Sequence, residues 1–406
     1  MIQRGADRRS GRGRRAGERA VLSLEGPPLV TCAHCGSSVP SGEFCGHCGA
    51  HLSIGSARRT HAYTAVPSER VAHLSIISTL FPHLPHRRGG PFRVALVAAG
   101  ALVVMLAALH LFAPATVAAV LVLPVLYLMY LYEVEIYETE PWLVIGATMV
   151  VGAVLGLVFA NITGVALSQL VLTGDRDTAF VLAGVVIPVV SQVLMLAGPL
   201  FIYLARDRFR EPLDGLAFGA ASALGFTLAS SLIQFWPLLT GPLVAEGSPL
   251  DWAVRLARAG LLVSLINACT TAAVAASIWL HRYDRRRSAR PWHTSILAAL
   301  LVAFGVQVAM GAISFFVDDL VLNVAIFAIV AGLLLLYLRL VIHDALLVEG
   351  TVHAGRAQGA PPEEIGPDSP CPECHRVVPT MRFCPACGAA RAAAPKQTRR
   401  RLAGGL

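Results

Sequence analysis

The chain has 406 residues, of which 55% are hydrophobic and only 14% are charged. Soluble proteins usually carry charge on about a quarter of their residues, so this composition excludes an ordinary soluble protein. Between residues 91 and 345 short charged clusters separate apolar runs that approach or exceed the roughly 20 residues needed to cross a bilayer. The runs do not alternate polar and apolar residues, which excludes a strand barrel. They predict an all-α polytopic membrane domain, because backbone hydrogen bonds in lipid must be made within each helix.

The formal net charge of +8 is concentrated at the two ends of the chain. Residues 1–20 hold seven arginines against Asp7 and Glu18, a net +5, and residues 391–406 hold five basic residues and no acid. We expect disordered basic tails at 1–28 and 391–406. Such tails can contact anionic lipid at the membrane surface. They contain no aromatic or folded motif that would indicate nucleic-acid binding.

Eight of the nine cysteines fall into two motifs of identical spacing, CxxC-x9-CxxC. The first lies within residues 29–52 and the second within residues 369–390. Two CxxC pairs that together supply four thiolates are the ligand set of a structural zinc ribbon. We therefore predict two structural zinc ions, with these ligands: Cys32, Cys35, Cys45 and Cys48 for the first, and Cys371, Cys374, Cys384 and Cys387 for the second. All four positions around each ion are filled by cysteine, which leaves no open position for a reactive water.

Residues 53–90 link the first ribbon to the membrane domain. Apolar residues at helical spacing from Val71 to Leu84 favour either a short interfacial helix or a plain linker that contains Pro82 and Pro85. About eight membrane-spanning helices follow within residues 91–345. Their expected ranges are 92–112, 115–132, 142–166, 179–205, 213–239, 252–280, 292–317 and 320–342. A second linker is expected at 346–368.

Arginine placement predicts the orientation. Arginines gather at residues 206–210 and 282–290, after the fourth and sixth expected spans, whereas the opposite loops carry mainly acids. By the positive-inside rule the arginine-rich loops face the cytoplasm. An even number of spans then puts both termini and both ribbons on the cytoplasmic side of the cell membrane, where the ribbons are suited to bind a protein partner.

Two stretches of the membrane domain have distinctive sequences. Residues 130–156 read YLYEVEIYETEPWLVIGATMVVGAVLG, an acidic loop that ends in Glu-Pro and leads into an Ala/Gly-rich helix. Residues 211–226 read EPLDGLAFGAASALGF. Both resemble the PrsW family of intramembrane metalloproteases, relatives of the CAAX-type prenyl endopeptidases, over residues 92–345. The resemblance implies a helical membrane domain with a metal-dependent peptidase site inside the bilayer.

The residues on which that chemistry depends are replaced in this chain. The resemblance implies a Glu-Glu-x-x-Lys motif, a Glu-Asn pair and two histidines. The matching positions hold Ser191, Gln192 and Met195, then Ser230 and Ser231, and finally Asn267 and Gln307. The polar members of this set form either ordinary interhelical hydrogen bonds or a shared polar pocket. The middles of the expected spans contain no Asp, Glu or Lys, and Cys269 is expected to be a small core residue.

These observations favour a non-catalytic PrsW-like membrane scaffold or sensor whose ribbons bind partner proteins. A divergent intramembrane peptidase is the first alternative. A transporter for a small polar solute is the second, although a cation path usually contains a carboxylate inside the membrane.

Overall fold

The fold is that of a computed structural model. The residues that it describes are 28–52 apart from 34, 35, 48, 50 and 51; 90–133; 142–173; 176–205; 209; 212–241; 248–283; 292–358; and 365–388 apart from 372, 373 and 375. The basic tails and the helix expected near residues 71–84 lie outside this set.

In the described part of the membrane domain, all regular elements are helices. Its elements are α2 (Gly90–Ala108), α3 (Phe112–Glu133), α4 (Trp142–Thr173), α5 (Arg176–Phe180), the π-helical η3 (Val181–Val186), α6 (Ile187–Ala205), α7 (Pro212–Gln234), α8 (Trp236–Leu239), α9 (Pro249–Leu256), the π-helical η4 (Ala257–Leu262), α10 (Val263–Tyr283), the 3-10 helix η5 (Trp292–Thr294), α11 (Ile296–Phe316) and α12 (Leu320–Gln358). Among the described residues, seven helices are long and apolar enough to span a membrane. The remaining expected span, 92–112, corresponds to α2, whose apolar part, Val94–Ala108, is shorter. The protein is thus a multi-pass membrane protein.

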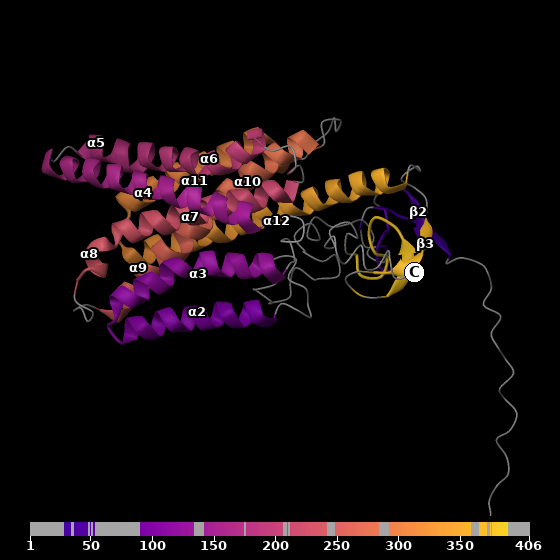
Figure 1. The fold of residues 1–406 in the computed structure, drawn as a ribbon, viewed down its shortest axis with the longest axis horizontal. Helices are drawn as coiled ribbons and strands as arrows, with labels where there is room; N and C mark the ends of the chain where they lie inside the picture. The colour runs from indigo at the N-terminus through magenta and orange to yellow at the C-terminus, as the bar shows by residue number, and fades with distance from the viewer. Residues whose placement is uncertain are drawn as a thin grey trace, which may run out of the picture.

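Consecutive passes run antiparallel, so α2 begins and α12 ends at the same end of the bundle (Figure 1). The two small ribbons lie beyond that end. Each ribbon contains a two-stranded antiparallel sheet: β1 (Leu29–Thr31) pairs with β2 (Ser38–Pro40), and β3 (Gly366–Pro370) pairs with β4 (Val377–Thr380). This arrangement agrees with the even number of spans expected from the sequence.

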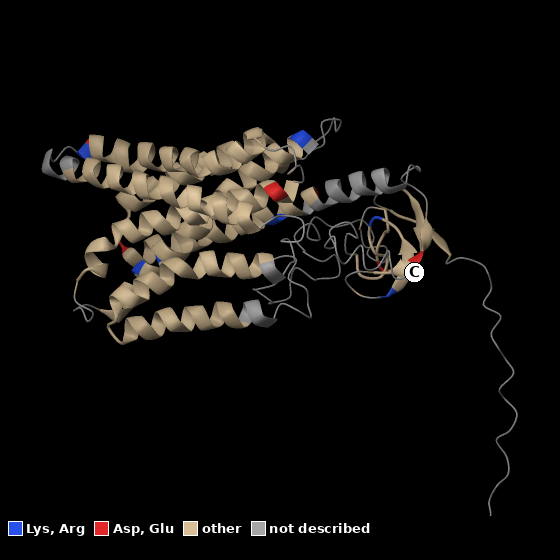
Figure 2. Cartoon of the chain, in the orientation of Figure 1, with Lys and Arg blue, Asp and Glu red and all other residues tan. Residues whose placement is uncertain are grey.

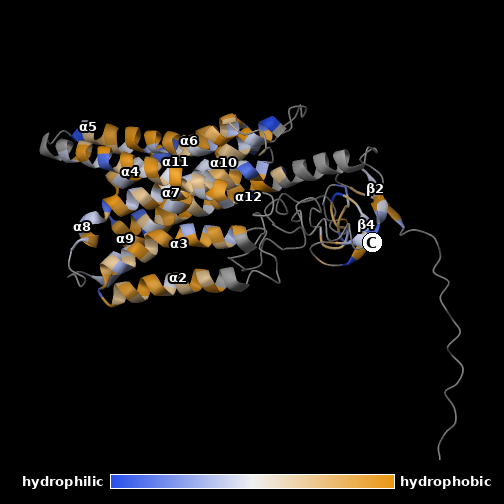
Figure 3. Ribbon diagram, in the orientation of Figure 1, coloured by the Kyte–Doolittle hydropathy of each residue, from blue (hydrophilic) through white to orange (hydrophobic). Residues whose placement is uncertain are grey.

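The outside of the bundle is apolar, as a lipid-facing surface requires. Leu143, Phe201, Leu204, Leu297 and Ile329 are exposed although they are large hydrophobic residues. Apolar colouring covers the bundle along its length in Figure 3, while Figure 2 shows its charged residues near the helix ends. The exposed apolar band is therefore continuous along the helices.

Helix α7 occupies the centre and is buried along most of its length. Glycines allow its neighbours to approach: a Cβ on Gly152 of α4 would collide with the backbone of Ser222, and one on Gly219 of α7 would lie 2.8 Å from Ala272 Cα of α10. Close backbone approach at small residues is the common way for helices to associate in lipid. The small residues of these helices therefore allow α7 to pack closely between α4 and α10.

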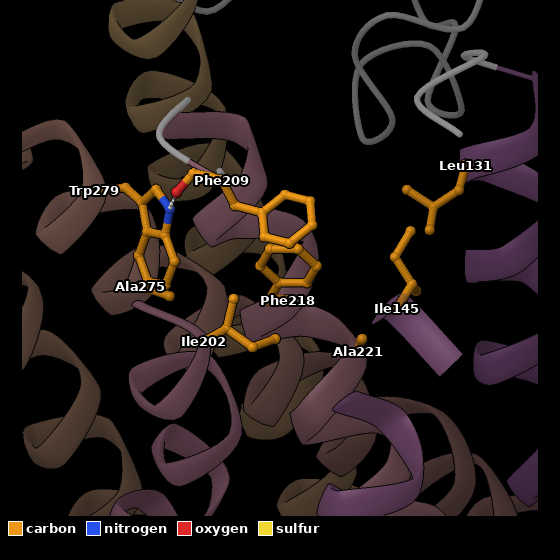
Figure 4. Close-up of a cluster of buried hydrophobic side chains, with 8 residues drawn as sticks. All are labelled: Leu131, Ile145, Ile202, Phe209, Phe218, Ala221, Ala275 and Trp279. Carbon is orange, nitrogen blue, oxygen red and sulfur yellow. Dashed lines mark hydrogen bonds between the residues drawn. The ribbon is translucent and has the colours of Figure 1, made fainter. Parts of the chain in front are cut away.

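Large aromatic residues pack together at the end of this core that lies nearer the ribbons. Phe209, Phe218 and Trp279 pack together with Ile145 and Ile202 (Figure 4). Trp279 Nε1 donates a hydrogen bond to the carbonyl of Phe209 at 3.1 Å, so the indole nitrogen is satisfied.

Helix α12 corrects one expected boundary. A linker was predicted from residue 346, but the helix continues to Gln358. Gly350 and Gly355 each cost a helix only about 1 kcal/mol. The first prolines after the span, which do stop helices, are Pro361 and Pro362. Glycine-rich composition alone was thus an insufficient signal for the helix end.

Candidate functional site

Three buried amide side chains from three helices meet inside the bundle. Gln307 of α11 donates from Nε2 to Gln192 Oε1 of α6 at 3.0 Å and to Asn267 Oδ1 of α10 at 2.7 Å. Gln192 is fully buried, and Asn267 and Gln307 are 8% and 7% exposed. The structure therefore brings together three of the six polar residues that the sequence singled out, although they are up to 115 positions apart.

Three threonines complete this amide network. Thr270 Oγ1 donates to Gln192 Oε1 at 3.0 Å, and Gln192 Nε2 donates to Thr271 Oγ1 at 3.2 Å. Asn267 Nδ2 donates to Thr227 Oγ1 of α7 at 3.3 Å. Sequence reasoning missed these threonines. Positions 267, 270 and 271 lie on one face of a helix, and that spacing was the signal that could have found them.

The three serines of the predicted set do not join the network through their side chains. Ser191 Oγ donates to the Pro188 carbonyl at 2.8 Å, and Ser230 Oγ donates to the Thr227 carbonyl at 3.2 Å. Both bonds stay within the serine's own helix, as is usual for serine in a membrane helix. Ser231 is buried on α7. The hydroxyl groups of Ser191 and Ser230 are therefore satisfied locally.

The amide network is neutral and closed. Among the described residues, its members are amides and hydroxyls, and none of their buried polar atoms lacks a hydrogen-bond partner. Amide and hydroxyl groups donate and accept hydrogen bonds but do not exchange protons near neutral pH. Cys269, which directly precedes Thr270 in α10, packs among Ile266, Met310 and Phe327 as the small core residue expected from the sequence. The arrangement can join four helices, but it supplies no base.

The membrane domain also has an open groove, which lies on a different face of α6. Its volume is about 360 Å³, and its walls are apolar side chains of α4, η3 and α6 with Thr163 as the one polar residue. Neither Gln192 nor Asn267 lines it. The groove thus does not open onto the amide network.

The C-terminal ribbon brings its four cysteines into a metal-binding arrangement. The sulfur atoms of Cys371, Cys374, Cys384 and Cys387 all lie within 4.8 Å of one another, and two of the pairs are 3.8 Å apart. A tetrahedron of thiolates around zinc, with Zn–S bonds of about 2.3 Å, has edges of about 3.8 Å. Hydrogen bonds from Cys371 and Cys387 lower the pKa of the Cys384 thiol to about 3, which favours the thiolate that binds metal. The residues present therefore fit a metal ion.

The N-terminal ribbon repeats this local structure at an offset of 339 residues. Cys32 and Cys45 are buried, while Cys35 and Cys48 lie outside the described residues. Cys32 N–H donates to Ser37 O at 2.9 Å, as Cys371 N–H does to Arg376 O. Gly36, Gly49 and Gly388 have φ values of +74°, +76° and +73°, as expected for residues that follow knuckle cysteines.

The two ribbons contact each other directly. Phe44 N–H donates to Pro385 O at 3.0 Å, and Phe383 N–H donates to Gly46 O at 2.9 Å. Both phenylalanines are buried. Segments from opposite ends of the chain therefore form one paired module.

Comparison with known proteins identifies the membrane domain. The family model described as "PrsW family intramembrane metalloprotease" matches residues 140–339, from the start of α4 into α12. This is narrower than the resemblance over 92–345 that the sequence suggested, and it leaves out α2, α3 and both ribbons. No curated protein and no solved structure matches the chain. The membrane-spanning part of this chain, over the matched residues, belongs to the PrsW family.

Proposed function

We propose that this chain is a PrsW-family membrane protein without peptidase activity, which acts as a scaffold or sensor with both ends in the cytoplasm. The observation that carries the proposal is the closed amide network of Gln192, Asn267 and Gln307. These residues stand where the family resemblance implies a glutamate and two histidines.

The chemistry of the network argues against hydrolysis there. Cleavage of a peptide bond needs a water made nucleophilic by a metal ion or by a general base. Zinc in a catalytic site needs three protein ligands from His, Cys, Asp or Glu, and the network has none of these. Loss of a single acid–base group typically costs about 10²–10⁴ in rate. The acid–base groups that the family resemblance implies are all replaced here. These side chains therefore serve to join α6, α7, α10 and α11 through hydrogen bonds.

The ribbons supply the second part of the proposal. We assign zinc to both cysteine sets, because four thiolates at tetrahedral spacing suit a structural zinc site. A ribbon of about 20 residues has too small a core to fold without metal. Loaded with zinc, the paired ribbons form a rigid body next to the bundle, suited to binding a cytoplasmic protein. The basic tails that adjoin the ribbons in sequence suit contact with anionic lipid.

A reconstitution assay tests the loss of activity. The purified chain is placed in liposomes with a labelled transmembrane peptide, beside an active PrsW-family enzyme as positive control. We expect the positive control to cut the peptide and this chain to leave it intact. Turnover that co-elutes with the chain and disappears in Gln192→Ala or Asn267→Ala would overturn the proposal.

The family match favours one competing function, intramembrane peptide hydrolysis. Its general base would have to come from outside the amide network, and the acidic segment with Glu135, Glu138 and Glu140, which precedes α4, is one candidate. Turnover that vanishes in Glu138→Gln or Glu140→Gln, but persists in Gln192→Ala, would establish this second function.

A further inference from the structure

The contact between the ribbons is symmetric at the backbone. Phe44 and Phe383 occupy the same place in the two motifs, one residue before the third cysteine, and Gly46 and Pro385 follow that cysteine. Each phenylalanine N–H donates to the carbonyl two residues further along the other ribbon's motif, at 3.0 and 2.9 Å. Exchange of the two ribbons maps this pair of bonds onto itself, as at the interface of a twofold homodimer.

The side chains at the interface are not symmetric. Gly42 and Gly46 of the N-terminal ribbon correspond to Met381 and Pro385 of the C-terminal ribbon. A Cβ on Gly42 would lie 2.7 Å from Pro385 O, and one on Gly46 would lie 2.9 Å from Met381 Cβ. The small residues of one ribbon thus receive the large residues of the other. Two N-terminal ribbons would leave gaps here, and two C-terminal ribbons would collide, which selects the unlike pair.

Metal-binding residues lie directly behind this interface. Met381 of the C-terminal ribbon packs on the hydrophobic cluster of Cys32, Val39 and Cys45 in the N-terminal ribbon. Two of these are ligands of the proposed zinc ion. The side chain that joins the ribbons therefore rests on the metal-binding core of its neighbour.

We propose that the two ribbons form a single clasp, residues 28–52 paired with residues 365–388, in which each ribbon is the specific binding partner of the other. The clasp closes only when both ribbons hold metal, because the pairing edge of a ribbon exists only in its folded, metal-bound form. The proposal goes beyond the absence of peptidase activity and does not depend on it. Loss of metal from one ribbon therefore releases the other ribbon, which lies near the opposite end of the chain.

A cleavage experiment on the full chain tests the clasp. A protease site inserted near residue 60 separates an N-terminal fragment, which carries an affinity tag and the first ribbon. In the zinc-loaded protein we expect this fragment to stay with the membrane domain on size-exclusion chromatography after cleavage. Removal of metal by a chelator, or Cys371→Ser with Cys374→Ser, should release it and lower its retention at least tenfold.

Gly42→Trp separates pairing from folding. Position 42 has an ordinary φ, and its counterpart Met381 shows that a ribbon accepts a large side chain there. We expect this variant to keep its zinc content yet lose the fragment, whereas Ser38→Trp, at an exposed position of the same ribbon, keeps both. Release of the fragment from the unmodified zinc-loaded chain would overturn the clasp. So would retention in Gly42→Trp, or retention after chelation. Should Gly42→Trp also lose zinc, Met381→Gly is the second variant, because it removes the contact of Met381 with Gly46 and with the cluster of Cys32, Val39 and Cys45. It must release the fragment, and its retention would equally overturn the clasp.

Discussion

The side-chain amide of Gln307 donates to Oδ1 of Asn267 at 2.7 Å and thereby joins α11 to α10 within the buried core. The same amide also bonds Gln192, so one side chain connects three helices. Replacement of the Gln307 side chain should therefore lower the stability of the folded membrane domain.

Gln307→Leu is predicted to lower the free energy of unfolding by about 1–3 kcal/mol, because it removes two hydrogen bonds and leaves buried acceptors with fewer donors. Thermal unfolding in detergent measures the change. Asn161→Leu is the matched control: this exposed amide bonds only the Leu157 carbonyl of its own helix, and we expect its substitution to cost less than about 0.5 kcal/mol. Equal effects of the two substitutions would contradict a structural role for the network.

Glycine packing gives a second stability prediction. Gly152→Leu forces α4 away from the backbone of Ser222 in α7, and overpacking of this kind typically costs about 1–3 kcal/mol or more. Gly146→Leu lies on the same helix, where a Cβ meets nothing within 4 Å, and should leave the midpoint of thermal unfolding nearly unchanged. If both variants melt alike, the close approach of α4 and α7 is wrong.

Metal analysis tests the ribbon assignment. Purified protein is expected to contain about two zinc ions per chain, one for each set of four cysteines. Cys32→Ser with Cys371→Ser should remove bound zinc while the unfolding temperature of the membrane domain stays the same, because the predicted ligands all come from the ribbons. Cys269→Ala, which changes a cysteine of the bundle core, should retain both ions. A zinc content near one or three in the unmodified chain would refute the count.

Topology mapping tests the orientation. Reporters placed at residue 55, after Arg286 and at the C-terminus are predicted to lie in the cytoplasm, and one near Gly247 on the opposite side. Helices α8 and α9, which precede and follow Gly247 in the chain, lie at the end of the bundle away from the ribbons (Figure 1). A reporter near Gly247 on the same side as one at residue 55 would mean that the count of crossings is wrong.

Much of this architecture follows from local sequence. The apolar runs place the membrane helices because lipid imposes both their length and their hydrogen bonding. The glycines after knuckle cysteines have the positive φ that their position demands. The set of Gln192, Asn267 and Gln307 came from the family resemblance, and no periodicity would have linked three residues on three helices.

Other features depend on tertiary contacts that a linear pattern does not encode. Thr227 belongs to the network only because α7 packs beside α10, and this contact is not indicated by the position of Thr227 in the sequence. The backbone hydrogen bonds of Phe44 with Pro385 and of Phe383 with Gly46 join residues 341 and 337 positions apart, and identical motifs permit such bonds without requiring them. The extension of α12 was missed because isolated glycines look like a linker in sequence yet cost a helix little.

That extension has a mechanical consequence. At about 1.5 Å per residue, the 39 residues of α12 make a rod about 58 Å long, nearly twice the thickness of the hydrocarbon core. Its membrane half contacts the bundle through Phe327 and Ala331, and its far end reaches toward the ribbons. A tilt of about 5° at the membrane end would shift the far end by about 5 Å over that length. A small tilt caused by repacking among the lipid-embedded helices would therefore become a larger displacement on the ribbon side.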